Sequence, residues 1–299
     1  MQRKLSHWTP GLLLAATIVF AAAPAHAGFV VFDNFNSYTA GSILNGQGPV
    51  GNTWTTPDTA AQGSITIVNV APGNNAVRFD NYTDNAAHRN YRSLQAAGLA
   101  IPNASSAATV FFTFKKGAGN LNFNTILSDL PAPTNLAGDS EVQLNEDYGS
   151  GTFFRGRSAN SFPLLTTAAG PTQLERDAAR IIPLADATYN VWLAIDNSTD
   201  TYKIYMQSNN DPALSSITQL LKSTDGAGTF TFRNSGSALQ ANDLITYNMG
   251  VGGGGFVGPV FIDDIYVDTG SANFANPVPE PATLSTLAIG ALALLRRRR

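Results

Sequence analysis

Residues 189–196 read YNVWLAID and residues 201–207 read TYKIYMQ, with the turn-forming letters NSTD between them. Successive side chains of a β-strand point to opposite faces, so alternate residues of the second segment share one apolar face. These residues are Tyr202, Ile204 and Met206. Trp192 and Tyr205 add large aromatic surfaces for burial. The two segments therefore predict an antiparallel β-hairpin.

Short runs rich in Val, Ile, Phe, Thr and Tyr recur along the chain, bounded by Gly, Asn, Asp and Pro. Only residues 173–182 (QLERDAARII) favour a helix, and that helix is short. Many strands with turn-rich gaps predict an all-β fold, an antiparallel β-sandwich or jelly roll. Besides the hairpin, strands are expected at residues 29–32, 64–70, 76–80, 108–115, 141–145, 152–155, 229–233, 245–249 and 260–267.

The N-terminal residues 1–27 have the three parts of a secretory signal peptide. Two basic residues near the start precede an apolar stretch at 11–23 (GLLLAATIVFAAA), which is expected to form a signal helix. Ala25 and Ala27 are the small residues that a signal peptidase requires around its cleavage point. The mature protein is therefore expected to begin at Gly28 and to be exported.

The C-terminus has three features in a fixed order. Pro279, Glu280 and Pro281 come first, and the two prolines favour extended backbone. The apolar run TLSTLAIGALALL follows, and as a helix it spans about 20 Å, short of a full hydrocarbon core. Four arginines end the chain and would hold this end on the cytoplasmic side of a membrane.

This order resembles the PEP-CTERM sorting signal over about residues 277–299. The resemblance implies that an exosortase processes the tail near its Pro-Glu-Pro motif, after a transient or anchored membrane contact through the short helix. It also implies the cell envelope, outer surface or extracellular matrix of a Gram-negative-type bacterium that produces exopolysaccharide. The expected organisation is a signal peptide at 1–27, one β-sandwich domain at 28–270, a spacer at 271–277 and the sorting signal at 278–299.

The hairpin also resembles the central hairpin of laminin G-like and concanavalin A-like jelly rolls, which has a W-x-x-x-D … Y-x-x-Y pattern. The opening FDNFNSYTAGSILNGQG with Trp54, and the closing FIDDIYVDTG, resemble exported concanavalin A-like domains that end in PEP-CTERM tails. This resemblance covers most of residues 29–270 and implies a concanavalin A-like jelly roll. It bears on fold far more than on activity.

The charge of the mature domain bears on its partners. Six of the 18 basic residues lie in the two end segments, but only Glu280 of the 21 acidic ones does. The predicted mature domain therefore has 12 basic and 20 acidic side chains, a net charge of −8. This balance opposes nucleic-acid binding, which needs cations against phosphates. The chain has no cysteine, which excludes disulfides and thiolate chemistry.

One motif suggests catalysis. Concanavalin A-like glycoside hydrolases of the laminarinase and agarase type carry E-x-D-x-x-E, and residues 141–146 read EVQLNE. Glu141 and Glu146 match the spacing of a catalytic acid pair. Gln143 replaces the middle aspartate, and an amide cannot ionise to set the protonation of its neighbours. Glycan hydrolysis or lysis at a degenerate Glu141/Glu146 site is therefore the alternative hypothesis.

Asp263 and Asp264 are calcium candidates, because carboxylate oxygens are the ligands that calcium prefers. Adjacent residues of a strand point to opposite faces, so at most one is expected to join a given site. The alternative is a pair of solvated charges at a strand edge. Asp196 and Asp200 flank the hairpin turn and are expected to stabilise the conformation of that turn. No other cofactor is indicated.

His88 is the single histidine of the predicted mature protein, so a histidine-based zinc site or catalytic triad would have to use it. Residues 84–92 around it are polar and aromatic. We expect them to form an exposed loop, with the lining of a sugar-binding groove as the alternative.

Two functions from different classes remain. The first is a non-catalytic surface or matrix module that binds exopolysaccharide or other envelope partners, and it is the one the sequence favours. The second is the glycan-cleaving enzyme described above. A purely structural role in the envelope has the same sequence features as the first function.

Overall fold

A computed structural model describes residues 28–57, 65–80, 87–117, 123–133, 138–146, 153–233, 242–252 and 258–278. The signal-cleavage residues Ala25 and Ala27 and the sorting-motif residues Pro279, Glu280 and Pro281 lie outside these ranges. Within them, no helix has the length and apolar character to cross a membrane.

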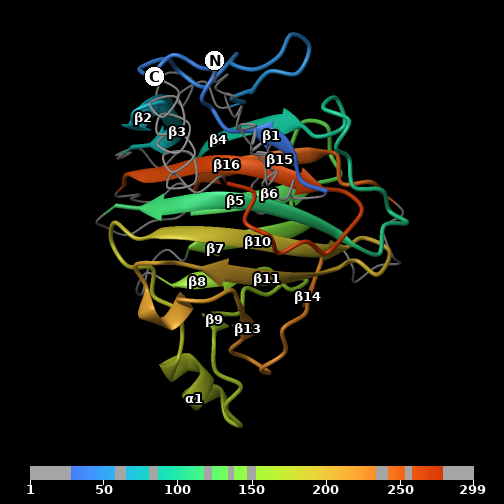
Figure 1. The fold of residues 1–299 in the computed structure, drawn as a ribbon. Coiled ribbons are helices and arrows are strands. Elements are labelled where there is room, and N and C mark those ends of the chain that lie inside the picture. The colour runs from blue at the N-terminus through green and yellow to red at the C-terminus, as the bar shows by residue number, and fades with distance from the viewer. Residues whose placement is uncertain are drawn as a thin grey trace, which may run out of the picture.

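The described strands form two stacked antiparallel sheets, as expected for a β-sandwich (Figure 1). The larger, nine-stranded sheet has the order β12 (Thr218–Gln219), β11 (Thr201–Gln207), β10 (Thr188–Asp196), β5 (Ala108–Lys116), β16 (Val260–Asp268), β3 (Asn74–Phe79) and β2 (Thr66–Ala71), with β1 (Val30–Asp33) paired to β16 and β14 (Phe230–Thr231) to β11. The five-stranded sheet has the order β4 (His88–Ser93), β15 (Thr246–Val251), β6 (Phe123–Ser128), β7 (Val142–Glu146) and β8 (Phe154–Gly156).

A smaller unit lies at one end of the sandwich (Figure 1). It contains the two-stranded pair β9 (Leu165–Thr166) and β13 (Leu221–Lys222) and the helix α1 (Gln173–Ala178). Thr172 and Glu175 cap α1 reciprocally, each side chain accepting a backbone N–H from the other residue. The short helix that the sequence predicted is confirmed, although it ends at Ala178. A 3₁₀ turn, η2 (Pro212–Leu214), follows β11.

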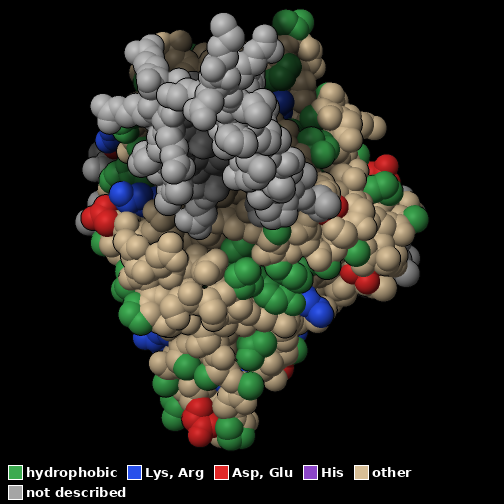
Figure 2. All heavy atoms as spheres, viewed as in Figure 1, with side chains coloured by type: hydrophobic (Ala, Val, Ile, Leu, Met, Phe, Trp, Pro, Cys, Tyr) green, Lys and Arg blue, Asp and Glu red, His purple; other side chains and the backbone are tan. Residues whose placement is uncertain are grey.

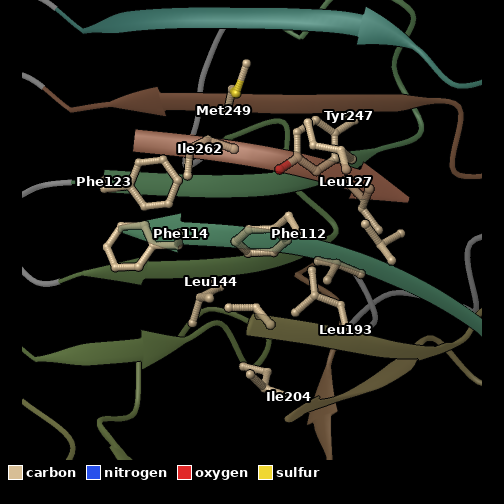
Figure 3. Packing of buried hydrophobic residues seen from close by; sticks show 14 of the residues in the cluster. Phe112, Phe114, Phe123, Leu127, Leu144, Leu193, Ile204, Tyr247, Met249 and Ile262 are labelled. Carbon is tan, nitrogen blue, oxygen red and sulfur yellow. The ribbon is translucent and has the colours of Figure 1, made fainter. Parts of the chain in front are cut away.

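The hydrophobic core lies between the sheets. Figure 3 shows side chains of β5, β10 and β16 pointing toward those of β6, β7 and β15. Phe114 of β5 stacks on Phe123 of β6 with ring centroids 5.2 Å apart, which joins the two layers directly. Large apolar residues are fully buried here because each strand gives alternate side chains to this interior.

The predicted hairpin is confirmed as β10 and β11. Its register pairs Leu193 with Ile204 on the core face and Trp192 with Tyr205 on the outer face. Tyr202, Ile204 and Met206 all lie in the core, as their alternation predicted.

Two strands of the five-stranded sheet were not expected. β4 occupies residues that the sequence analysis assigned to an exposed loop, and that expectation was wrong. Its sequence, HRNYRS, contains no β-branched residue, so the strand signal was absent. β6 is a fully buried strand that pairs with both β15 and β7. Tertiary pairing, rather than local propensity, forms β4.

Residues 271–278, here called the C-terminal strap, pack on the outer face of the nine-stranded sheet. Figure 1 shows this red segment crossing β5 and β10. The Asp268 carboxylate accepts hydrogen bonds from the backbone N–H groups of Gly270 and Ser271, which turns the chain back over the sheet. Thr109 of β5 donates to the Ser271 carbonyl at 2.9 Å and fixes the start of the strap.

The strap covers an aromatic cluster. The Phe274 ring lies 4.4 Å from that of Tyr205, and Trp192 Nε1 donates to the Ala275 carbonyl at 3.1 Å. Phe111 and Tyr266 complete the cluster beneath. Hydrophobic side chains gather near the middle of this face in Figure 2. The segment that leads to the sorting motif is therefore part of the packed domain.

Replacing Phe274 by alanine is expected to lower the free energy of unfolding by about 1–2 kcal/mol, because a partly buried ring loses its contact with Tyr205. Urea unfolding followed by tryptophan fluorescence measures the change. Ile217→Ala, at a position 41% exposed outside the strap, is the control, with an expected change below about 0.5 kcal/mol. Equal losses in the two variants would show that the strap does not stabilise the domain.

Candidate functional site

The structure separates the two glutamates of the E-x-D-x-x-E-like motif. β7 pairs with β6 and β8 without a bulge, so its side chains alternate regularly. Glu146 therefore shares the core face with Val142 and Leu144. Glu141 lies just before β7, and its charge acts on Arg157, whereas the charge that acts on Glu146 is that of Lys116. The geometry does not bring the two carboxylates together as a catalytic pair.

Glu146 is held inside the sandwich by an ion pair across the two layers. Lys116 Nζ of β5 lies 3.0 Å from Glu146 Oε1, and the glutamate side chain is fully buried. Its other oxygen, Oε2, has no hydrogen-bond partner. Burial raises the pKa of Glu146 to about 8, although the charge and hydrogen bond of Lys116 oppose that shift. This carboxyl is a structural group of the core.

Removing one partner of this pair is expected to destabilise the fold strongly. Glu146→Ala leaves the Lys116 ammonium buried without a counter-charge, which costs about 3–5 kcal/mol. The double variant Lys116→Met/Glu146→Leu removes both charges and is expected to recover most of that loss. Urea unfolding of the three proteins measures the difference. A Glu146→Ala protein as stable as the wild type would contradict the importance of the pair.

The outer face of the five-stranded sheet is polar although it is largely buried. Strand register places side chains next to one another across neighbouring strands, about 4.8 Å apart. One cross-strand row, here called the polar row, runs across all five strands. Its members are Tyr91 of β4, Asn248 of β15, Ile126 of β6, Gln143 of β7 and Arg157 just after β8.

A second row lies beside the polar row, one step along the strands. Gly250 in its centre has no side chain, and a Cβ there would lie 2.6 Å from the His88 carbonyl oxygen. Glycine therefore lets β15 and β4 approach closely, with the Arg89 side chain lying against it. The members of this row are Arg89, Gly250, Asn124, Asn145 and Arg155.

Gln143 is fixed by three hydrogen bonds. Its carbonyl oxygen accepts from Ser140 Oγ at 3.1 Å and from Arg157 Nε at 3.0 Å. Its amide nitrogen donates to Asn124 Oδ1. Gln143 therefore links the Ser140 hydroxyl, the Arg157 guanidinium and the Asn124 amide, and forms no acid–base pair.

In the described part of the chain, four residues of these rows have a buried polar atom without a hydrogen bond, and one of them is Arg155, through its Nε. Asn248 is fully buried, and neither its amide nitrogen nor its oxygen forms a hydrogen bond. Asn145 Oδ1 and Arg157 Nη1 are also buried without a hydrogen bond. Leaving such groups unsatisfied costs about 1–3 kcal/mol each, so their presence calls for an explanation. A ligand at this face would supply the missing partners.

The sequence analysis did not single out Asn248, Asn145 or Arg157. The signal was available in part, because in β15 (TYNMGV) the apolar residues Tyr247, Met249 and Val251 alternate with Thr, Asn and Gly. The alternation predicts that Asn248 faces away from the core. It does not reveal that the neighbouring strands bring other amides beside it.

His88 faces the core and is only 2% exposed. The regular pairing of β4 with β15 places it opposite Val251, a core residue. The predicted exposed loop is thus wrong at this residue, and the alternative role in a sugar groove does not fit a side chain on the core face. The exposed part of this stretch is on the other side of the strand, at Tyr91 and Arg89.

The hairpin aspartates serve the turn, as expected. Asp196 Oδ1 accepts hydrogen bonds from the backbone N–H of Ser198 at 3.1 Å and from its hydroxyl at 2.6 Å. Asp200 adopts a positive φ of 52°, which aspartate tolerates better than most residues.

Asp263 and Asp264 lie at a bulge of β16, where the register with β5 shifts. Asp264 has a φ of 54°, and both side chains are buried, so the alternative of solvated edge charges was wrong. Burial and the neighbouring Asp264 charge raise the pKa of Asp263 to about 8. Burial also raises the pKa of Asp264.

Calcium takes about six to eight oxygen ligands. In the described ranges, no group of three or more His, Cys, Asp or Glu side chains is placed to hold a metal ion. Asp263 Oδ1 already accepts the backbone N–H of Asp264 at 2.8 Å. The two aspartates therefore do not complete a calcium site by themselves, and a structural calcium stays a prediction.

The raised pKa of Asp263 predicts a pH-dependent stability difference. The folded state binds the proton of Asp263 more tightly than the unfolded state does. Protonation of Asp263 therefore stabilises the fold, and this stabilisation is fully present below about pH 4 and is lost as the pH rises to about 8. Asp263→Asn removes the titration. The variant is expected to gain stability relative to the wild type as the pH rises from 4 to about 8, measured as the difference in Tm at each pH. A constant difference would contradict the assignment.

Comparison with solved structures finds similar folds at low identity. A glycoside hydrolase family 131 β-glucanase catalytic domain from Podospora anserina is 11% identical, covering 83% of this chain and 100% of its own, with a TM-score of 0.48. Lectin II from Ulex europaeus is 9% identical, covering 79% and 96%, with a TM-score of 0.44. Lectin I-B4 from Griffonia simplicifolia is 9% identical, covering 80% and 98%, with a TM-score of 0.45. These likenesses concern the fold, and no activity is transferred from them.

No curated protein sequence matches the chain. Residues 277–299 match the PEP-CTERM protein-sorting motif, which confirms the resemblance seen in the sequence. A motif of this type indicates export to the cell envelope of a Gram-negative bacterium. The chain is an exported protein in which an antiparallel β-sandwich precedes a PEP-CTERM sorting signal.

Proposed function

We propose that the β-sandwich is a non-catalytic surface or matrix module that binds extracellular polysaccharide on the outer face of its five-stranded sheet. The unpartnered amide of Asn248, at the second position of the polar row, carries this proposal. Native proteins rarely keep a buried amide without hydrogen bonds, because the cost falls on the stability of the fold. A ligand that both donates and accepts hydrogen bonds explains why the amide is retained.

Sugar hydroxyls are groups of this kind, since each both donates and accepts a hydrogen bond. The polar row spans five strands, roughly 19 Å at the usual strand spacing, which suits an extended polymer better than a small metabolite. Tyr91 at one end of the row offers a half-buried ring for contact with a sugar face. Export to the envelope would place the domain where polysaccharides occur.

The same geometry argues against glycan cleavage. Cleavage of this type needs two carboxyl groups flanking one bond, about 5–10 Å apart and facing the substrate. Glu146 instead faces the core and binds Lys116, and Gln143 stands where the motif has an aspartate. Glu141 is left without a carboxylate partner from its own motif. The alternative hypothesis of a Glu141/Glu146 enzyme therefore has the weaker support.

The decisive experiment is depletion of the purified exported protein from solution by a panel of insoluble polysaccharides, including the matrix of the producing bacterium. Each polymer is tested with calcium and with a chelator, which also tests the predicted calcium. We expect retention on at least one polymer class. Retention on none of them would contradict polysaccharide binding. A structural or protein-binding role would then be the better explanation.

Asn248→Leu is the sharpest variant for this site. It replaces an unsatisfied amide by an apolar group of similar size, so we expect a gain in stability of about 1–2 kcal/mol together with a loss of polymer retention. Thermal unfolding and the depletion assay measure the two effects. Lys203→Ala, an exposed substitution on the other sheet, is the matched control. A less stable Asn248→Leu protein that still binds would contradict the proposal.

Sugar release from the same polymers tests the alternative. We expect the wild-type protein to release no reducing sugar. Release that Glu141→Gln abolishes, while leaving retention intact, would establish the enzyme in place of the binding module.

A further inference from the structure

We propose that the ligand of the polar row is an acidic polysaccharide, one of whose sugar carboxylates binds the guanidinium of Arg157. This inference rests on the proposed function, because it names the chemical class of polymer for the same site. It is carried by the position, burial and missing hydrogen bond of Arg157 at the β8 end of the row.

One nitrogen of the Arg157 guanidinium is hydrogen-bonded within the protein, and another has no hydrogen-bond partner. Its Nε donates to Gln143 Oε1 at 3.0 Å, and the guanidinium lies 4.1 Å from the centre of the Phe162 ring. The residue is only 3% exposed, yet Nη1 has no hydrogen-bond partner. A guanidinium fixed in this way is preorganised, so little side-chain freedom is lost when a ligand binds.

The electrostatic surroundings favour an anion at this position. Burial lowers the pKa of Arg157 to about 10; the positive charge of Arg233 also lowers it, while Tyr202 and Glu141 act in the opposite direction. The guanidinium nonetheless stays charged at neutral pH. A buried cation that lacks one hydrogen bond is best satisfied by a carboxylate, which accepts short charge-assisted hydrogen bonds.

The amide side chains of the polar row and of the second row beside it suit the neutral parts of the same polymer. Gln143, Asn124, Asn145 and Asn248 offer amide groups for hydroxyls, and none of them is charged. Arg89 and Arg155 of the second row are also cationic, but both are half-buried, whereas Arg157 is almost fully buried and its Nη1 lacks a hydrogen bond. A polymer with a carboxylate on its sugar units places one anion there while its hydroxyls meet the amides.

The net charge of the protein makes the interaction specific. The predicted mature domain carries a net charge of −8, so an acidic polymer is repelled by the surface as a whole. Adsorption of such a polymer without a defined site is therefore disfavoured. Retention of an acidic polymer by this protein reports a local cationic site rather than general charge attraction.

The test compares one polymer in two chemical forms. Immobilised polygalacturonate is set beside the same polymer after reduction of its carboxyl groups to alcohols, which keeps the chain and removes the charge. We expect the full exported protein to bind the acidic form at least about tenfold more tightly, the effect of one charge-assisted hydrogen bond. This comparison needs no variant and so does not depend on how a mutant folds.

Two arginine variants then assign the effect. Arg157→Gln is expected to bind both polymer forms equally. Arg157→Lys is expected to keep part of the preference for the acidic form, because lysine keeps the positive charge but lacks the planar guanidinium with its paired N–H donors. Arg180→Gln is the matched control, since Arg180 lies 4.0 Å from the Phe153 ring but outside the polar row. We expect Arg180→Gln to prefer the acidic polymer over the reduced one as strongly as the wild type does.

The outcomes separate the two proposals. Equal retention of both polymer forms by the wild type, or preference for the reduced form, overturns the acidic ligand and leaves polysaccharide binding standing. An unchanged preference in Arg157→Gln overturns the assignment to Arg157. Retention of neither form, nor of any neutral polymer in the panel, overturns the proposed function and this inference with it.

Discussion

The regular alternation of side chains along β7 is the constraint on which the rest of the site depends. From Val142 to Glu146 the strand has no bulge, so Glu146 joins Val142 and Leu144 on the core face while Gln143 and Asn145 face outward. One face of β7 then belongs to the core and the other to the polar row. A bulge at this strand would change which residues share a face and would build a different site.

Each sheet has one face in the core, and charged groups that turn inward need partners from the opposite layer. Lys116 of β5 meets Glu146 of β7, and Arg92 of β4 lies 2.6 Å from Asp33 of β1. Both pairs join the nine-stranded sheet to the five-stranded one. Buried pairs of this kind add little net stability but make alternative packings costly. They therefore fix the alignment of the layers, and with it the register from which the polar row is built.

The outer faces of the two sheets differ in what covers them. The nine-stranded sheet is covered by the chain's own C-terminal strap, whose Phe274 and Ala275 contact Tyr205 and Trp192. The outer face of the five-stranded sheet instead keeps amides without partners. The strap also reaches the start of the sorting motif, so the packed domain extends along the chain as far as that motif. One face is thus covered by the chain itself, and the other keeps the unpartnered groups on which the proposed binding rests.

The sequence by itself determined the all-β class, the hairpin of β10 and β11, and the sorting motif at 277–299, because these depend on local periodicity, turn residues and an ordered motif. It did not determine β4, whose residues become a strand only through pairing with β15. The candidate site was decided by the tertiary structure alone. Asn248 is far from Gln143 and Arg157 in the chain, and only the order and register of the β15–β6, β6–β7 and β7–β8 pairs bring the three residues into one row.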